Sequence, residues 1–145
     1  MLSKHAEVTW LTGMTFDARS GQHHLMLDSA PTPEASRGPG PMDLLLVALA
    51  ACTAMDVVSI LQKARQPLTG LVVRAEGERA TEHPRRYTRV TLVYEVHGTG
   101  LDRAQVERAV NLSEEKYCSV SGSLKEQVAI DTRIELDEPM PADPA

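Results

Sequence analysis

The longest stretch of this chain without glycine or proline runs from residue 42 to 66 and is strongly apolar over residues 44–52. Pro41 suits the first position of a helix, and the Asp43 carboxylate favours the positive end of the helix dipole. We therefore predict a helix from Asp43 to about Arg65, about 34 Å long and ended by Pro67. The apolar run is shorter than the about 20 residues that span a bilayer, so we expect a central helix buried on most sides.

Alternation of apolar and polar residues, the pattern of half-buried strands, recurs on both sides of this helix. It predicts strands over residues 8–16, 22–28, 71–78, 90–96 and 128–136. Turns at Asp17–Gly21 and around His83-Pro84 join the first four strands into two hairpins. A proline-rich loop over residues 29–41 leads to the long helix, and Asp102 can cap a second helix that runs to about Lys116.

The size and charge of the chain limit its domain number and its partners. A chain of 145 residues suits one domain, which we place at residues 1–137, followed by a flexible proline-containing tail at 138–145. The formal net charge of −5 repels nucleic acid and anionic membrane surfaces, so neither is expected as a partner. The N-terminal residues alternate in polarity and show no secretory signal, which makes the cytoplasm the expected compartment. Two cysteines in that compartment predict a transient disulfide at most.

Cys52 lies within the apolar part of the long helix. Its simplest interpretation is a buried, inert thiol. Reactivity requires the thiolate, which an apolar environment disfavours unless a cation or hydrogen-bond donors stabilise it. Asp56, one turn further on the same face, would oppose the thiolate, so a compensating cation is needed. Arg37 and Arg19 are candidates, whereas Lys63 is too far along the helix.

Local spacing gives no reason to expect a metal or another cofactor. His23 and His24 are adjacent, and in a strand they point to opposite faces, so they cannot share a metal ion without distortion. Neither Cys52 nor Cys118 has a neighbour at the spacing of common metal-ligand motifs. We therefore expect surface histidines, no bound metal and no cofactor.

Two segments carry a resemblance to a known family. They are GPMDLLLVALAACTAMDVVSIL at residues 40–61 and EEKYCSV at residues 114–120. Together they resemble the OsmC/Ohr family, and more closely its YhfA-like branch. The resemblance implies an α+β fold in which antiparallel sheets wrap around two main helices, in an intertwined homodimer with active sites at the subunit interface.

The resemblance also implies a chemistry for oxidative stress defence. Cys52 matches the peroxidatic thiol, which reduces an organic hydroperoxide, and Cys118 matches the resolving thiol, which forms a disulfide that a dithiol then reduces. The substrate would be a small apolar hydroperoxide, because Ala48, Leu49 and Met55 surround Cys52 on the helix. General thiol-disulfide exchange is less favoured, because the cysteines do not form a Cys-x-x-Cys motif.

One position departs from the family pattern. The peroxidases have a glutamate directly after the helix-starting proline, where it orients an arginine against the thiolate, and this chain has Met42 there. Spacing does not decide between Arg37 and Arg19 for that arginine. The departure leaves a second function open, in which a non-catalytic, stress-associated dimer binds an apolar small molecule at the subunit interface.

Overall fold

The computed structural model describes residues 2–137 and contains two compact units, one up to Leu45 and one from Leu46 onward. The first unit is an antiparallel meander of β1 (Glu7–Thr12), β2 (Thr15–Ser20) and β3 (His23–Asp28). A short 3₁₀ turn, η1 (Pro33–Ala35), follows in the proline-rich loop. The tail expected at residues 138–145 lies outside the described residues.

The meander has three strands where the sequence predicted two. The chain turns at Gly13, whose φ of +54° favours glycine, and the Trp10 indole donates a hydrogen bond of 2.9 Å to the Gly13 carbonyl. The expected turn at Asp17–Gly21 is therefore mostly strand β2, and the chain reverses again at Gly21, whose φ is +60°. The alternation of apolar residues continues through the turn at Gly13, so the sequence pattern did not reveal that turn.

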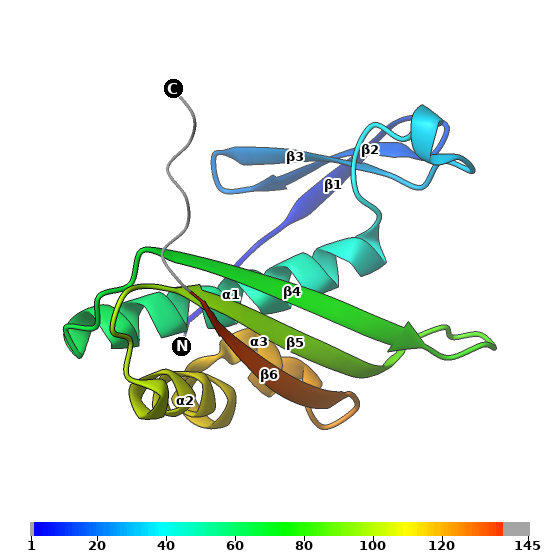
Figure 1. Cartoon of the computed structure of the whole chain (residues 1–145). Helices are drawn as coiled ribbons and strands as arrows, with labels where there is room; N and C mark the ends of the chain where they lie inside the picture. The colour runs from blue at the N-terminus through cyan, green and yellow to red at the C-terminus, as the bar shows by residue number, and fades with distance from the viewer. Residues whose placement is uncertain (1, 138–145) are drawn as a thin grey trace. The chain divides into compact units, whose positions relative to one another are not determined.

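The second unit is an α+β arrangement of one long helix, a three-stranded sheet and shorter helices (Figure 1). The long helix α1 (Pro41–Lys63) precedes the antiparallel strands β4 (Gly70–Arg79) and β5 (Tyr87–His97). The chain then forms α2 (Arg103–Leu112), the π-helical turn η2 (Ser113–Tyr117) and α3 (Ser119–Leu124). It returns as β6 (Ala129–Asp137), which pairs with β5 in parallel. The antiparallel pairing expected from the resemblance thus holds for β1–β3 and for β4–β5, but not for β5–β6.

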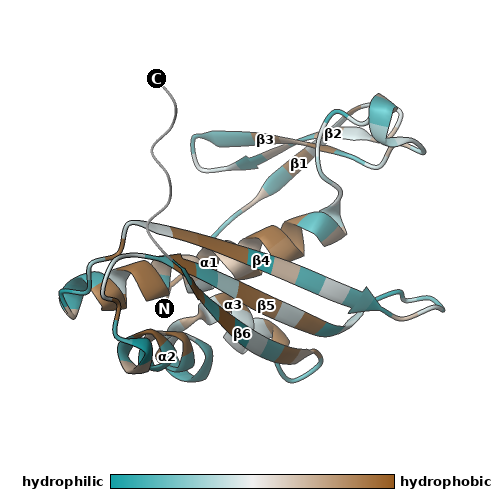
Figure 2. Cartoon of the chain, in the orientation of Figure 1, coloured by the Kyte–Doolittle hydropathy of each residue, from teal (hydrophilic) through white to brown (hydrophobic). Residues whose placement is uncertain are grey.

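The core of the second unit lies between β5 and the helices. The even positions of β5, which the alternation predicted to be the apolar face, are almost completely buried and are Val90, Leu92, Tyr94 and Val96. Helix α1 contributes a buried stripe with a period of four residues, made of Leu49, Thr53, Val57 and Leu61. Figure 2 shows the apolar residues that run along α1 and β5.

The remaining surface of α1 is exposed in the single chain. Met55 is 72% exposed and Val47 is 56% exposed, so the expectation of a helix buried on most sides is wrong for the chain alone. By length and composition α1 could cross a membrane, which also overturns the expectation that its apolar run is too short. A helix in the core of a soluble protein passes the same test, and the stripe from Leu49 to Leu61 is buried within the second unit.

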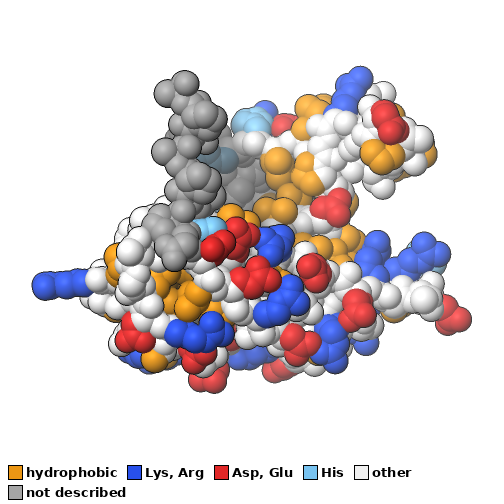
Figure 3. Space-filling view, in the orientation of Figure 1, with side chains coloured by type: hydrophobic (Ala, Val, Ile, Leu, Met, Phe, Trp, Pro, Cys, Tyr) orange, Lys and Arg blue, Asp and Glu red, His pale blue; other side chains and the backbone are white. Residues whose placement is uncertain are grey.

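The exposed side of the β4–β5–β6 sheet carries charged side chains of both signs. Figure 3 shows them intermixed over the surface of the second unit. Arg74 pairs with Glu95 at 2.7 Å and with Glu135 at 3.3 Å, and Arg89 pairs with Asp131. Mixed charge of this kind is typical of a face in contact with solvent. We therefore expect a functional site on the opposite side of the sheet, where the helices lie.

Candidate functional site

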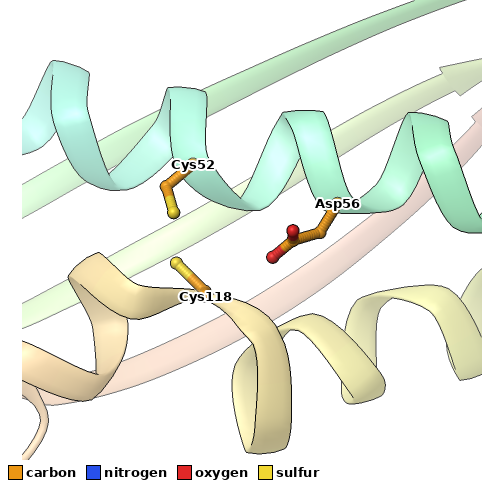
Figure 4. Close-up of side chains that lie close together, drawn as sticks. All are labelled: Cys52, Asp56 and Cys118. Atoms are coloured by element: carbon orange, nitrogen blue, oxygen red, sulfur yellow. The ribbon is translucent and has the colours of Figure 1, made fainter. Parts of the chain in front are cut away.

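Two cysteines and one carboxylate meet on the helical side of the second unit. Cys52 and Asp56 lie one turn apart on α1, and Cys118 lies between η2 and α3 (Figure 4). The Cys52 Sγ, the Cys118 Sγ and an Asp56 carboxylate oxygen are all within 4.8 Å of one another. The fold thus joins the two thiols that the sequence singled out, with Asp56 on the expected side of the helix.

The position of Cys118 is fixed by the backbone on both sides. Its amide donates a hydrogen bond of 2.7 Å to the Ser113 carbonyl, which closes the π-helical turn. Cys118 is also the N-cap of α3, and its Sγ accepts a hydrogen bond of 3.3 Å from the Ser121 amide. Only 4% of the residue is exposed. The sulfur points toward α1 (Figure 4) and has little access to solvent.

A chain of buried hydroxyl groups holds the Asp56 carboxylate. Ser113 Oγ donates to Asp56 Oδ2 at 2.8 Å, and Thr53 Oγ1 lies 2.8 Å from Ser113 Oγ and 2.7 Å from the Tyr94 hydroxyl. A hydroxyl has one hydrogen to donate, so Thr53 donates to Ser113 and Tyr94 donates to Thr53. Burial raises the pKa of Tyr94, which keeps the phenol protonated as the first donor of this chain.

Burial and neighbouring acidic groups disfavour the thiolate of Cys118. Burial raises the pKa of Cys118 to about 12, the Ser121 amide opposes this rise, and Cys52 and Glu114 add to it. Burial also raises the pKa of Glu114, whose Oε2 accepts a hydrogen bond of 3.0 Å from Ser121 Oγ. Glu114 Oε1 is buried and has no hydrogen-bond partner among residues 2–137. Within residues 46–137, neither Asp56 nor Glu114 forms an ion pair with a lysine or an arginine.

A family model described as OsmC-like protein matches residues 32–133. The chain belongs to the OsmC-like family. The resemblance noted from the two cysteine segments is thereby confirmed. Protein YhfA of Escherichia coli K12 is 42% identical over 125 residues, which cover 86% of this chain and 92% of YhfA.

Solved structures share the OsmC-like fold. A hypothetical protein from Aquifex aeolicus has a TM-score of 0.86 at 28% identity. The match covers 97% of this chain and 100% of the Aquifex chain. The organic hydroperoxide resistance protein OhrB of Bacillus subtilis has a TM-score of 0.64 at 14% identity, with 92% and 98% covered. The expectation of an α+β, OsmC-like fold is confirmed.

The two arginines proposed as thiolate supports both belong to the first unit of this OsmC-like chain. Arg19 forms an ion pair of 3.2 Å with Asp17 on the surface, and the Arg37 amide donates a hydrogen bond of 3.0 Å to Asp28 Oδ2. In the second unit, Lys63 and Arg108 line a cavity of about 530 Å³ between α1 and α2, which also reaches Asp56 and Tyr117. These two cations face a space beside the site and do not pair with its carboxylates.

Several polar residues that surround the thiols were not predicted from the sequence. They are Thr53, Tyr94, Ser113 and Glu114, of which Thr53 had a usable signal, as a threonine within an otherwise apolar stripe. The expectation that Leu49 lies on the substrate side of the helix is wrong, because Leu49 is fully buried in the core. Ala48 and Met55, from the same expectation, are exposed.

Proposed function

We propose that this protein is a thiol-dependent reductase of organic hydroperoxides, with Cys52 as the peroxidatic thiol and Cys118 as the resolving thiol. The observation that carries the proposal is the distance of at most 4.8 Å between the two sulfurs. A disulfide has an S–S length of about 2.0 Å, so the two sulfurs must approach each other by at most about 3 Å to form it. The half-buried Cys52 is the more accessible of the two thiols, which suits the group that meets the substrate.

The reaction has three balanced steps. The Cys52 thiolate attacks the distal oxygen of the hydroperoxide ROOH, the O–O bond breaks, and the alkoxide takes a proton and leaves as ROH, with Cys52 as a sulfenic acid. The Cys118 thiol then attacks the Cys52 sulfur and releases water, which forms the disulfide. A dithiol reductant restores both thiols and becomes a disulfide itself. This chemistry fits the cytoplasm, where such reductants maintain free thiols.

Formation of the Cys52 thiolate requires a positive charge in surroundings that contain Asp56 and Glu114. We propose that Arg37 or Arg19 supplies it. Helix α1 also has an exposed apolar surface, which includes Val47 and Met55. We propose that a second copy of the chain covers this surface in a homodimer, and that the resulting apolar setting selects small apolar hydroperoxides.

Intact-protein mass spectrometry after treatment with cumene hydroperoxide tests the proposal. The reduced protein should lose two hydrogens as the Cys52–Cys118 disulfide forms. A Cys118→Ser variant should instead accumulate a sulfenic acid that dimedone traps at Cys52, and a Cys52→Ser variant should do neither. Thiols that stay reduced, or oxidation confined to methionines such as the exposed Met55, would reject the peroxidase function.

A second candidate is a non-catalytic dimer that binds an apolar small molecule. Met42, which replaces the family glutamate, and the absence of an ion pair on Asp56 within residues 46–137 favour it. In that case the thiols remain reduced in hydroperoxide, while an apolar ligand still raises the melting temperature, because binding to the folded state stabilises it. The same hydroperoxide treatment therefore separates the two functions.

A further inference from the structure

We propose that Cys52, Asp56 and Cys118 form a zinc site when the two thiols are reduced. The sequence predicted no metal, because the spacing of these residues matches no common metal-ligand motif. The fold changes that prediction, because it joins two residues of α1 to a residue that lies at the start of α3. This inference requires reduced thiols but does not depend on peroxidase activity.

The positions of the three donor atoms suit a tetrahedral ion. The two sulfurs and an Asp56 oxygen lie within 4.8 Å of one another and point toward a common space (Figure 4). Ligand atoms of tetrahedral zinc are about 3.5–3.8 Å apart, given Zn–S and Zn–O lengths of about 2.3 and 2.0 Å. Closure by roughly 1 Å, within the range of side-chain rotation, would complete the three-ligand arrangement.

Two of the three ligands already have the outer hydrogen bonds that orient metal ligands. Ser113 donates to the Asp56 carboxylate and is itself held by Thr53. The Ser121 amide donates to the Cys118 sulfur, as amides do at metal-bound thiolates. The groups that donate these hydrogen bonds lie on η2, α3 and α1, so helical elements hold the ligands in position.

The local charge also favours a dication. Asp56 and Glu114 lie near the thiols, and neither forms an ion pair with a lysine or an arginine of residues 46–137. One oxygen of Glu114 is buried without a partner among the described residues. A bound dication would be compensated by its own three ligands, the two thiolates and the Asp56 carboxylate.

The chemistry of the donors selects the ion. Two thiolates and one carboxylate suit zinc, whereas magnesium and calcium prefer sites made of oxygen ligands alone. Three protein ligands leave a fourth position for water. Because the same sulfurs form the disulfide, zinc binding and disulfide formation exclude each other, so zinc should protect the thiols from oxidation.

Titration of zinc into the reduced, metal-free full chain, without an affinity tag, tests the inference. We expect one zinc ion per chain, and cobalt in its place should show a near-ultraviolet sulfur-to-cobalt charge-transfer band. Cys52→Ser and Cys118→Ser should each weaken binding by at least about 100-fold. Asp56→Asn, which still accepts the Ser113 hydrogen bond, should weaken it by about 10-fold or more. Glu115→Gln is the matched control, because Glu115 is exposed on η2 and should leave the affinity unchanged.

Circular dichroism of each variant checks that the helices remain folded. Undiminished zinc affinity in a Cys52→Ser/Cys118→Ser double variant would assign the ion to the histidines and overturn the inference. The same conclusion would follow if the wild-type chain bound no zinc, bound one ion per two chains, or bound equally well after Asp56→Asn. None of these measurements uses hydroperoxide, so failure of the zinc site and failure of the peroxidase function are distinguishable.

Discussion

The hydroxyl of Tyr94 on β5 and Oγ1 of Thr53 on α1 share a buried hydrogen bond of 2.7 Å. Both residues are completely buried, and the bond continues through Ser113 to the Asp56 carboxylate. The centre of the sheet is thereby connected to the edge of the thiol site by three successive hydroxyl groups. A substitution that removes one of these hydroxyl groups from the core should therefore alter the hydrogen bonding of the Asp56 carboxylate.

Thr53→Val keeps the volume of this side chain and removes its hydroxyl, which leaves Tyr94 without its acceptor and Ser113 without a donor. We expect the free energy of unfolding to fall by about 1–3 kcal/mol, the cost of an unsatisfied buried polar group. Urea denaturation measures this loss. Thr53→Ser retains the hydroxyl and should cost clearly less; equal losses in the two variants would assign the effect to packing alone.

Cys118 should react slowly with alkylating reagents. Its raised pKa of about 12 leaves little thiolate at pH 8, and it is 4% exposed, while alkylation requires an accessible thiolate. Mass spectrometry of peptides after brief treatment with iodoacetamide should find Cys118 largely unmodified, with full modification after unfolding in urea. Modification of folded Cys118 at the rate of a free thiol would contradict its described environment.

Leu49 should be one of the most sensitive residues of α1. It is fully buried, and truncation of such a leucine leaves a cavity, so Leu49→Ala should lower the free energy of unfolding by about 2–5 kcal/mol. Denaturant unfolding followed by circular dichroism checks the value. A loss below about 0.5 kcal/mol, typical of surface substitutions, would show that the stripe on α1 is not a packed core.

Met55 tests the proposed dimer. A lysine at this exposed apolar position would place a charge within an interface between two copies, so Met55→Lys should shift the protein from dimer to monomer. Sedimentation equilibrium measures the change. Asn111→Lys adds the same charge on the exposed side of α2 and should leave the association unchanged. A wild-type chain that sediments as a monomer would refute the dimer directly.

The ion pair between Arg74 and Glu95 should give stability that disappears in acid. The hydrogen bond from Arg74, and then that from His97, lowers the pKa of Glu95 below 4.5 in the folded chain. A carboxyl with a lowered folded pKa stabilises the protein above its unfolded pKa, and that stability is lost as the pH falls through the folded value. Both Glu95→Gln and Arg74→Gln should therefore be less stable than wild type at pH 7.

The difference between wild type and each of these variants should decrease between about pH 5 and pH 3, as Glu95 becomes protonated. Urea denaturation at pH 7 and at pH 3.5 makes the comparison. A difference that stayed constant with pH would mean that the two side chains contribute through packing and not through charge.

Much of the second unit could be predicted from the sequence, because its signals are local. Pro41 and the stretch without glycine or proline gave α1 to within two residues at each end. The helix ends at Lys63, and Arg65 adopts a left-handed φ of 56° just beyond it. The alternating strands and the Asp102 cap, which accepts a hydrogen bond from the Ala104 amide, are confirmed as well.

Features that depend on contacts between distant segments could not be predicted in this way. The approach of Cys118 to Cys52 depends on the π-helical turn Ser113–Tyr117, and no residue pattern in this segment predicts such a turn. The hydrogen bond between Thr53 and Ser113 joins α1 to η2, so the polar Thr53 in an apolar stripe could mark a buried hydrogen bond, but the sequence does not indicate its partner. For the same reason the sequence predicted no metal: the three proposed zinc ligands become neighbours only in the folded chain.

The parallel pairing of β6 with β5 has a consequence for the synthesis of the protein on the ribosome. All of α2, η2 and α3 must emerge before β6 can reach its partner, and contacts between such distant segments form slowly. Until then, the edge of β5 lacks a neighbour and is open to wrong pairing with another nascent chain. The yield of correctly folded protein should therefore depend on how quickly β6 is synthesised. It should also depend on any chaperone that covers the unpaired edge of β5 until then.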